Sequence, residues 1–404
     1  MRRKTMAVAQ DKAPIWSLIL MLSGGLIGSG LLALPICIGL AGFWPALAGL
    51  IGVWIFMTFT GCVVAGRVVE HKENYFDIPS LFGEVLGSKL KWVAIVANVI
   101  LLYGLLVAYL AGASSILDHT FHLQLNTTLT ILIVFVIMTA LNVFGIHIVR
   151  RGNIVFMAIL VVSFLYLLFS TGAHMQTENF HHIGWIYLVI ALPVLVNAYN
   201  CHNLIPTVCT SLDFDLKKIR FTIIGGLLVG FIINTSWTIA VVGAMKMHGF
   251  DGLLYSFQHN YPVTVSLSHL LHTHLFLVMA LLFGLMAILT SYITMGAALC
   301  NFVRDLRVHY SKINSRYMDL ILAFIPPLII TIIMPNIFLS IQSIIGSFGI
   351  GLLFGFLPAL MFVGAVKTAF GKLWGYLVAA FFLIVMLLVT LNDFGFFIRF
   401  GLHP

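Results

Sequence analysis

The chain has 404 residues, of which 61% are hydrophobic and 8% are charged, and its formal net charge is +8. These proportions exclude an ordinary soluble globular domain and are typical of an integral membrane protein. The polar, basic segment before Ile15 carries no cleavage site of small residues, so we expect no cleaved signal peptide. The five cysteines show no metal-ligand spacing, and we expect neither a metal site nor a disulfide framework.

Polar clusters divide the sequence into eleven candidate membrane helices, each close to the length of about 20 apolar residues that crosses a bilayer. Their expected limits are 15–38, 42–66, 91–117, 127–148, 153–171, 185–211, 221–246, 275–302, 318–334, 337–363 and 373–397. The longest polar stretches, 67–91, 247–274 and 303–317, have room for a short surface helix and no soluble domain.

The basic residues orient this bundle. With the N-terminus inside and the spans alternating, 19 of the 21 Lys and Arg residues fall inside, all except Lys246 and Arg399. Cytoplasmic loops of membrane proteins carry such an excess of basic residues. The positive charge is therefore a topology signal and predicts no nucleic-acid partner, with the N-terminus cytoplasmic and the C-terminus outside.

The first span contains "GGLIGSG", in which Gly24, Gly25, Gly28 and Gly30 fall within seven residues. A broken membrane helix exposes backbone N–H groups and the positive end of a helix dipole, and glycine permits such a break and a close ligand approach. We therefore expect these glycines to form an unwound segment. The alternative is a face of small residues packed against another helix.

The sixth span contains "LPVLVNAYNCHNLIPTV", which places several amides, a histidine and two prolines at mid-membrane depth. Polar residues there are costly and are expected to face a cavity. Five spans separate this segment from the first one, so the two enter from opposite sides, as in inverted repeats that form a site at the midplane. We expect one transmembrane domain, 1–404, with repeats 15–171 and 185–363 and an extra helix, 373–397.

Several segments in order resemble the hydroxy and aromatic amino acid permease family, the bacterial tyrosine- and tryptophan-specific permeases of the amino acid–polyamine–organocation superfamily. They are "IGSGLLALP", "LYGLLVAYLAGAS", "LPVLVNAYNCHNLIPTV", "DFDLKKIR", "LTSYITMGAALCNFVRDL" and "FIPPLIITIIMP". The resemblance implies the leucine-transporter fold with a 5+5 inverted repeat and broken helices 1 and 6, and proton-driven uptake of an aromatic amino acid across the bacterial inner membrane. The family's Gly-Phe-His-Gly segment is Asn200–Cys201–His202–Asn203 here, which puts the substrate side chain in question.

The breaks suggest how an amino acid is held. We expect its carboxylate at the N–H groups of Gly28, Ser29 and Gly30, because helix N-termini bind anions. We expect its ammonium at carbonyls near Ser23 and Gly24, with help from the backbone around Asn197.

Aromatic and hydroxyl side chains complete the expected site. Tyr103 and Tyr109 are six residues apart on one helix, so we expect only one of them to line the cavity. Tyr199 is a candidate lid or stacking partner. Ser291 is a candidate substrate contact, and Thr290 and Thr294 are candidate sodium ligands, although Ser and Thr in membranes often bond their own helix.

His202 is the only side chain in a break that titrates near neutrality, so we expect it to take part in proton coupling or in a polar network. Sodium coupling through Thr290 and Thr294 is the alternative. Asn200 and Asn203 either bond across the break, which leaves an aromatic substrate possible, or face the pocket, which favours a smaller or polar amino acid. We expect the first.

The sequence offers little to other functions. A membrane enzyme needs a nucleophile with a base or a metal cluster, and no buried carboxylate and no Gly-x-Ser-x-Gly segment occurs. A channel needs polar stripes along several helices, whereas polarity here is concentrated in two segments. No phosphate-binding Gly-rich motif occurs, so we expect no ATP-driven pump and no cofactor.

Overall fold

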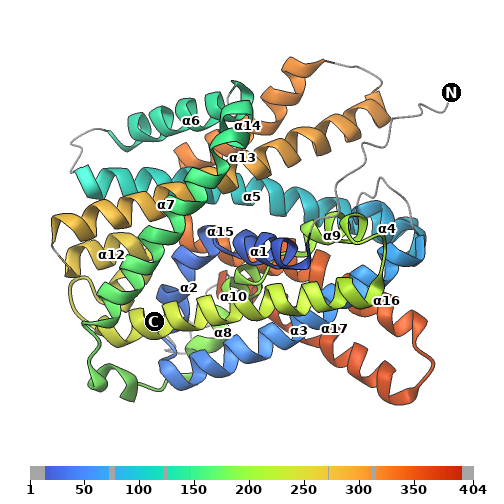
Figure 1. Ribbon diagram of the computed structural model, residues 1–404, viewed down its shortest axis with the longest axis horizontal. Coiled ribbons are helices and arrows are strands. Elements are labelled where there is room, and N and C mark those ends of the chain that lie inside the picture. Colours follow the sequence, from blue (N-terminus) through green and yellow to red (C-terminus); the bar gives the residue numbers. More distant parts are fainter. Residues whose placement is uncertain are drawn as a thin grey trace.

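The computed structural model describes residues 14–71, 78–121, 126–144, 146–271, 273–311 and 315–393, and within these ranges the chain is helical throughout, without strands (Figure 1). The helices follow in chain order as α1 (Ile15–Leu26), α2 (Ser29–Gly39), α3 (Phe43–His71), α4 (Ile78–Leu86), α5 (Ser88–Phe121), α6 (Thr127–Phe144), α7 (Ile146–Gly172), η1 (Thr177–His181), α8 (Trp185–Ala198), η2 (His202–Leu204), α9 (Ile205–Ser211), α10 (Leu216–Ala244), α11 (Leu253–Gln258), α12 (Val263–Leu270), α13 (His274–Ser311), α14 (Arg316–Ile333), α15 (Phe338–Ile344), the π-helix η3 (Ile345–Phe356), α16 (Leu357–Ala365) and α17 (Ala369–Asp393).

Most of the predicted spans are present as long apolar helices. In the described ranges nine helices are long and apolar enough to cross a membrane, or ten when the bent pair α1–α2 counts as one span. The fourth predicted span, 127–148, corresponds to α6, whose apolar stretch Thr127–Val143 is shorter than the others. The chain is therefore a multi-pass membrane protein, and the count of eleven spans stays a prediction.

Two connecting segments contain the short helices expected of them, and some membrane helices run past their predicted limits. The stretch 67–91 contains α4, and 247–274 contains α11 and α12. The eighth span, in contrast, runs on as α13 to Ser311 instead of ending at 302. Residues 303–311 contain no Gly or Pro to end the helix.

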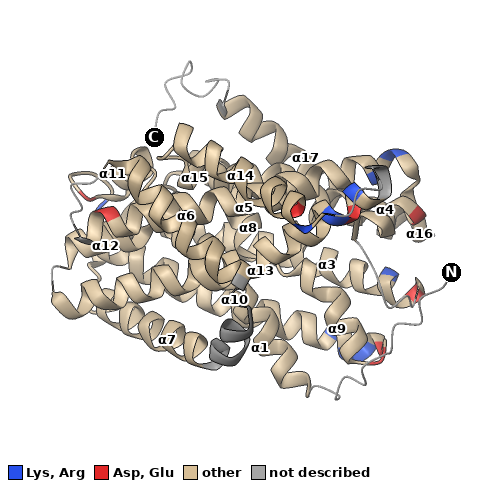
Figure 2. Cartoon of the chain, turned by 90° about the horizontal axis from the view of Figure 1, so that it is seen from above, with Lys and Arg blue, Asp and Glu red and all other residues tan. Residues whose placement is uncertain are grey.

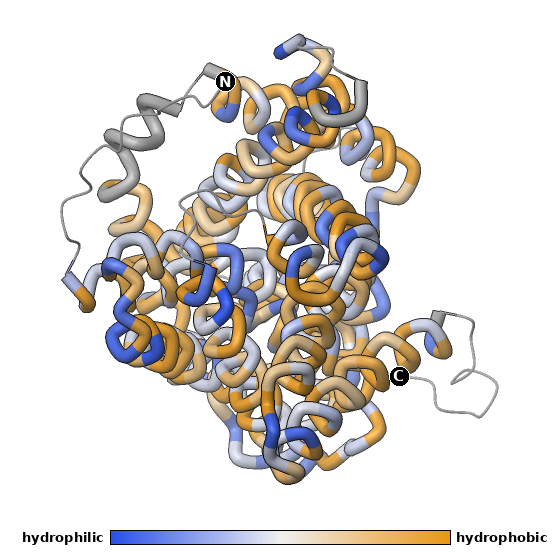
Figure 3. Tube along the Cα trace, turned by 90° about the vertical axis from the view of Figure 1, so that its right-hand side faces the viewer, coloured by the Kyte–Doolittle hydropathy of each residue, from blue (hydrophilic) through white to orange (hydrophobic). Residues whose placement is uncertain are grey.

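The surface of the bundle suits a bilayer. Large apolar side chains such as Val136, Phe169 and Ile333 are exposed on the outer faces of the long helices, and apolar residues colour most of each helix in Figure 3. Lys and Arg gather at the end formed by α4, α9 and α16 (Figure 2). Since α10 begins at that end, Lys246, just beyond its last residue, lies at the other.

The two predicted break regions lie next to each other because their helices pack closely. α2 packs on α8, α1 packs on α10, and α13 packs on both α5 and α7. The π-helix η3 also lies directly against α8, since a Cβ added at Gly346 would stand 1.8 Å from the carbonyl oxygen of Pro193. No side chain larger than hydrogen fits there, so this contact is between two backbones.

Candidate functional site

The first span is broken at two residues only. α1 ends at Leu26, α2 begins at Ser29, and their axes differ by 58°. Ile27 (φ −86°, ψ 88°) and Gly28 (φ −148°, ψ −154°) form the link. The prediction that four glycines are unwound is therefore wrong for Gly24, Gly25 and Gly30, which lie inside helices. Helix hydrogen bonding continues up to the break, where the carbonyl of Gly24 accepts from the N–H of Ile27 at 3.1 Å.

Gly28 and Gly30 bring the first break against two other helices. A Cβ added at Gly28 would lie 3.2 Å from Oγ of Ser291 in α13. One added at Gly30 would lie 3.3 Å from the Cα of Ala198, the last residue of α8. Ser23 lies one turn earlier, buried, and its hydroxyl donates to the carbonyl of Leu20 at 3.2 Å. Gly30 thus permits backbone contact between the two breaks.

The second break follows α8. Tyr199, Asn200 and Cys201 leave the helix before the single turn η2 and the short helix α9. The carbonyl of Ala198 accepts a hydrogen bond from Nδ2 of Asn234 in α10 at 3.2 Å. The last carbonyls of a helix have no partner within it, so Asn234 stabilises the end of α8. Sequence reasoning missed this residue.

Asn197 forms a second hydrogen bond at the end of α8. Its Nδ2 donates to Oε1 of Gln342 in α15. Gln342 is fully buried, and its Nε2 has no hydrogen-bond partner among the described residues. The sequence analysis passed over Gln342, although an amide within an apolar span is the kind of signal that identified Asn197.

A hydroxyl cluster stands beside the first break. The buried Tyr109 of α5 is in hydrogen-bonding contact with the side chains of Ser29 and Ser291. Its ring meets that of Tyr292 edge-on, with centroids 6.5 Å apart. Tyr199 is fully buried, and its side chain faces Asn234. The structure thus brings together Ser29, Tyr109 and Ser291 from three helices.

Tyr103 lies elsewhere. Its hydroxyl donates to the carbonyl of Leu322 in α14 at 2.7 Å, away from both breaks. The proline four residues after Leu322, Pro326, has no N–H to offer that carbonyl. Tyr103 supplies the missing donor.

The two threonines of α13 bond their own helix. Thr290 Oγ1 donates to the carbonyl of Met286 at 2.8 Å, and Thr294 Oγ1 donates to that of Thr290 at 2.9 Å. Thr294 is exposed, whereas Ser291 between them faces Gly28. Each threonine thus bonds its own helix, which is the alternative to sodium binding that the sequence analysis left open.

His202 is fully buried behind the second break. Its Nε2 lies 3.1 Å from Oγ1 of Thr60 in α3, and its ring stacks on Phe354 of η3 with centroids 5.1 Å apart. Nδ1 has no hydrogen-bond partner among the described residues. One ring nitrogen is therefore held and the other remains open to a proton or a polar group.

Asn200 and Asn203 do not stabilise the break as expected. The side-chain oxygen of each is buried and accepts no hydrogen bond from the described residues. The Nδ2 of Asn203 lies 3.9 Å from Sδ of Met295. The hydrogen bonds expected of Asn200 and Asn203 are made instead by Asn197, to Gln342, and by Asn234, to the carbonyl of Ala198.

A cavity of about 530 Å³ extends from Asn203 toward the end of the bundle where the basic residues gather. Residues of α4, α5, α9, α13 and η3 contribute to its walls. Its lining residues include Asn98, Leu102, Asn203, Met295, Phe354 and Asp305. The second break is thus accessible from this end.

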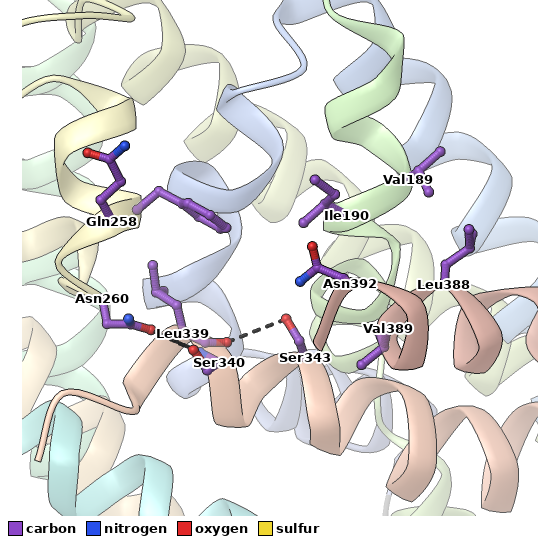
Figure 4. Close-up of a pocket in the computed structure, with 11 residues that line it drawn as sticks. Val189, Ile190, Gln258, Asn260, Leu339, Ser340, Ser343, Leu388, Val389 and Asn392 are labelled. Atoms are coloured by element: carbon purple, nitrogen blue, oxygen red, sulfur yellow. Dashed lines mark hydrogen bonds between the residues drawn. The ribbon is translucent and has the colours of Figure 1, made fainter. Parts of the chain in front are cut away.

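A second cavity, of about 230 Å³, lies toward the opposite end, between α8, α11, α15 and α17 (Figure 4). At its rim Oδ1 of Asn260 accepts from both the N–H and the hydroxyl of Ser340, each at 3.0 Å. None of the residues predicted for the site lines it. It is separate from the two breaks.

Comparison with known proteins gives consistent matches over most of the chain. The model of the tryptophan/tyrosine permease family matches residues 11–393. A tyrosine-specific transport system 1 of Haemophilus influenzae is 24% identical over 95% of this chain and 97% of the relative. A tryptophan-specific transport protein of Shigella flexneri is 24% identical over 83% of each. The crystal structure of MhsT in complex with L-phenylalanine superposes with a TM-score of 0.63 at 17% identity, covering 95% of this chain and 99% of that one. This likeness shows the leucine-transporter-like fold.

Proposed function

Because the chain belongs to the tryptophan/tyrosine permease family, whose members are transporters and not enzymes, we propose that it takes up tyrosine, tryptophan or phenylalanine. Transport is secondary active, by alternating access and in symport with protons. The protein resides in the bacterial cytoplasmic membrane with its N-terminus inside, and the inverted repeats are 15–171 and 185–363.

The observation that carries the proposal is the backbone contact between the two breaks at Gly30 and Ala198. Ser29 and Gly30 precede the first hydrogen bond of α2, which runs from the N–H of Leu31 to the carbonyl of Gly28 at 3.1 Å. Their own N–H groups are free for the carboxylate of an amino acid. Tyr109 and Ser291 adjoin the same point and add hydroxyl donors.

The ammonium group binds on the other side of this contact. The carbonyls near Ser23 and Gly24 end α1, and those near Asn197 end α8, so both present the negative end of a helix dipole. Tyr199 covers the substrate. The cavity of about 530 Å³ serves as its exit route toward the basic end of the bundle.

His202 carries the proton in this proposal. No Asp, Glu, Lys or Arg lies in either break. Thr60 holds one ring nitrogen of His202, and the other has no hydrogen-bond partner in the part of the chain that the structure describes. In His202→Gln a polar amide, which does not titrate, takes the place of the imidazole. We expect the variant to exchange labelled substrate across the membrane without accumulating it under a pH gradient. Full uphill transport driven by pH alone would rule out the proton role.

A second candidate is a transporter of the same fold that is sodium-coupled or that carries a small or polar neutral amino acid such as serine or threonine. The buried, unpartnered oxygens of Asn200 and Asn203 favour it, because they suit a polar substrate. If transport is sodium-coupled, uptake follows a sodium gradient and fails in Thr290→Ala and Thr294→Ala.

A competition panel in proteoliposomes decides between the two. Labelled tyrosine uptake is measured under a proton gradient with excess tyrosine, tryptophan and phenylalanine, and in parallel with excess serine, threonine, alanine and glutamine. We expect only the aromatic set to compete. Transport of serine or threonine that the aromatic set leaves unaffected contradicts the proposal.

A further inference from the structure

One carboxylate stands in the large cavity. Asp305 lines it near the end of α13, and it has no ion-pair or hydrogen-bond partner among the described residues. Its neighbour Arg307 faces away and pairs with Asp319, Nη2 to Oδ1, at 2.5 Å. The cavity therefore contains a carboxylate at the end of the bundle where the Lys and Arg residues gather.

The position of Asp305 connects it with the substrate site. Ser291, Met295, Ala298, Phe302 and Asp305 follow one another at intervals of three or four residues, so they form one face of α13. The face begins beside Gly28 and runs along the cavity wall. At about 1.5 Å per residue, Asp305 lies roughly 20 Å beyond Ser291.

The walls around the carboxylate are of two kinds. Three amides, Asn98, Asn203 and Asn301, line the cavity together with Asp305. Apolar side chains line most of the rest, among them Leu101, Leu102, Phe302 and Phe354. A negative charge beside amides and an apolar, partly aromatic wall is complementary to an amino acid with a large apolar side chain.

We propose that this cavity is a second, inner binding station for the amino acid, where Asp305 binds the ammonium group after the substrate has left the breaks. The amides bind the carboxylate, and the wall of Leu101, Leu102, Phe302 and Phe354 contacts the side chain. The proposal rests on the proposed function, because its ligand is the transported substrate. The breaks themselves hold no carboxylate, so the two stations bind the ammonium by different chemistry.

Membrane vesicles of both orientations test the station. Asp305→Asn keeps the size of the side chain and removes its charge, so we expect the KM for tyrosine presented from the cavity side to rise about tenfold. The KM from the other side stays as it was. Glu70→Gln is the matched control, since it removes a carboxylate from the same end of the bundle outside this cavity. An equal change in both KM values, or none in either, overturns the proposal.

A chemical readout does not depend on transport. Ala298→Cys places a thiol in the cavity, and its reaction with a cationic and an anionic methanethiosulfonate reagent is compared, with the parent chain as background. We expect the ratio of cationic to anionic rates to fall about threefold when Asp305→Asn is added. An unchanged ratio overturns the station. A fall in the ratio in a protein that carries no aromatic amino acid supports the cation site and rejects only the proposed function.

Discussion

At the scale of single residues, two prolines explain why two aromatic side chains donate hydrogen bonds to backbone carbonyls of neighbouring helices. Proline offers no N–H to the carbonyl four residues before it. Pro35 thereby leaves the carbonyl of Leu31 free, and the indole Nε1 of Trp237 donates to it at 3.2 Å. Pro326 leaves that of Leu322 free, and Tyr103 donates to it. Both aromatic residues replace a lost helix hydrogen bond from a neighbouring helix.

Tyr103 is therefore expected to stabilise the fold without contacting substrate. Tyr103→Phe leaves the carbonyl of Leu322 without a hydrogen-bond donor inside a membrane-spanning helix, which costs about 1–3 kcal/mol. We expect a lower melting temperature in detergent and an unchanged KM for uptake. Tyr317→Phe, at a side chain that is 81% exposed, is the control and changes neither. A raised KM with an unchanged melting temperature would restore Tyr103 to the substrate site.

Gly30 has a different role, because it sets the distance between the breaks. In Gly30→Ala the new methyl group stands 3.3 Å from a backbone atom of Ala198, which cannot move aside as a side chain does. We expect uptake to fall several-fold while the protein still reaches the membrane, since the backbone must shift by a few tenths of an ångström and a shift near 1 Å at a site costs roughly 100-fold. Gly66→Ala in α3, where a Cβ meets nothing within 4 Å, serves as the control. Normal uptake by the Gly30 variant contradicts a site at this contact.

At the scale of elements, sequence reasoning found both broken helices and placed them correctly in the chain. Glycines, amides and a histidine within apolar spans indicate irregular backbone, because such residues are costly in a continuous membrane helix. The number of unwound residues was overestimated, since Gly24, Gly25 and Gly30 lie within helices and allow close packing against their neighbours.

Two features of the site escaped the sequence analysis, because tertiary structure determines the hydrogen bonds that define them. Asn234 and Gln342 are single amides in apolar helices, and only the tertiary structure shows that they bond the end of α8. The π-helix η3 has the same apolar composition as a regular span, so its hydrogen-bond pattern leaves no trace in the periodicity.

The element α15 depends on a loop contact. Asn260 binds the N–H of Ser340 in the first turn of α15, so it acts as a cap from another segment (Figure 4). Asn260→Ala removes this partner, and a lost cap costs about 1 kcal/mol. We expect faster labelling of a cysteine introduced at Ser343, one turn further along. Ser340→Ala, which loses the hydroxyl contact and keeps the N–H contact, is expected to label at an intermediate rate. Equal rates in all three proteins contradict the capping role.

At the scale of the whole molecule, charge separates the two ends of the bundle. The helix ends near α4, α9 and α16 carry most of the described Lys and Arg residues (Figure 2). The cavity of about 530 Å³ opens toward this end, and the cavity of about 230 Å³ lies toward the other. If the basic end is cytoplasmic, as the distribution of Lys and Arg favours, the larger cavity is the route by which substrate reaches the cell interior.

The role of the larger cavity in substrate release therefore depends on the predicted orientation of the chain in the membrane. Glu178 lies in η1, between the end of α7 and the start of α8, and Lys367 follows α16 at the basic end. Both positions lie in short connections between helices. With cysteines introduced singly at each, an impermeant thiol reagent added to intact cells should label position 178 and leave position 367 until the membrane is opened. Chains with the opposite orientation show the reverse pattern, which would make the large cavity face outward and assign it to substrate entry. Labelling of both positions from outside means that the number of spans between them is even. In that case one of the apolar helices between α7 and α16 does not cross the membrane.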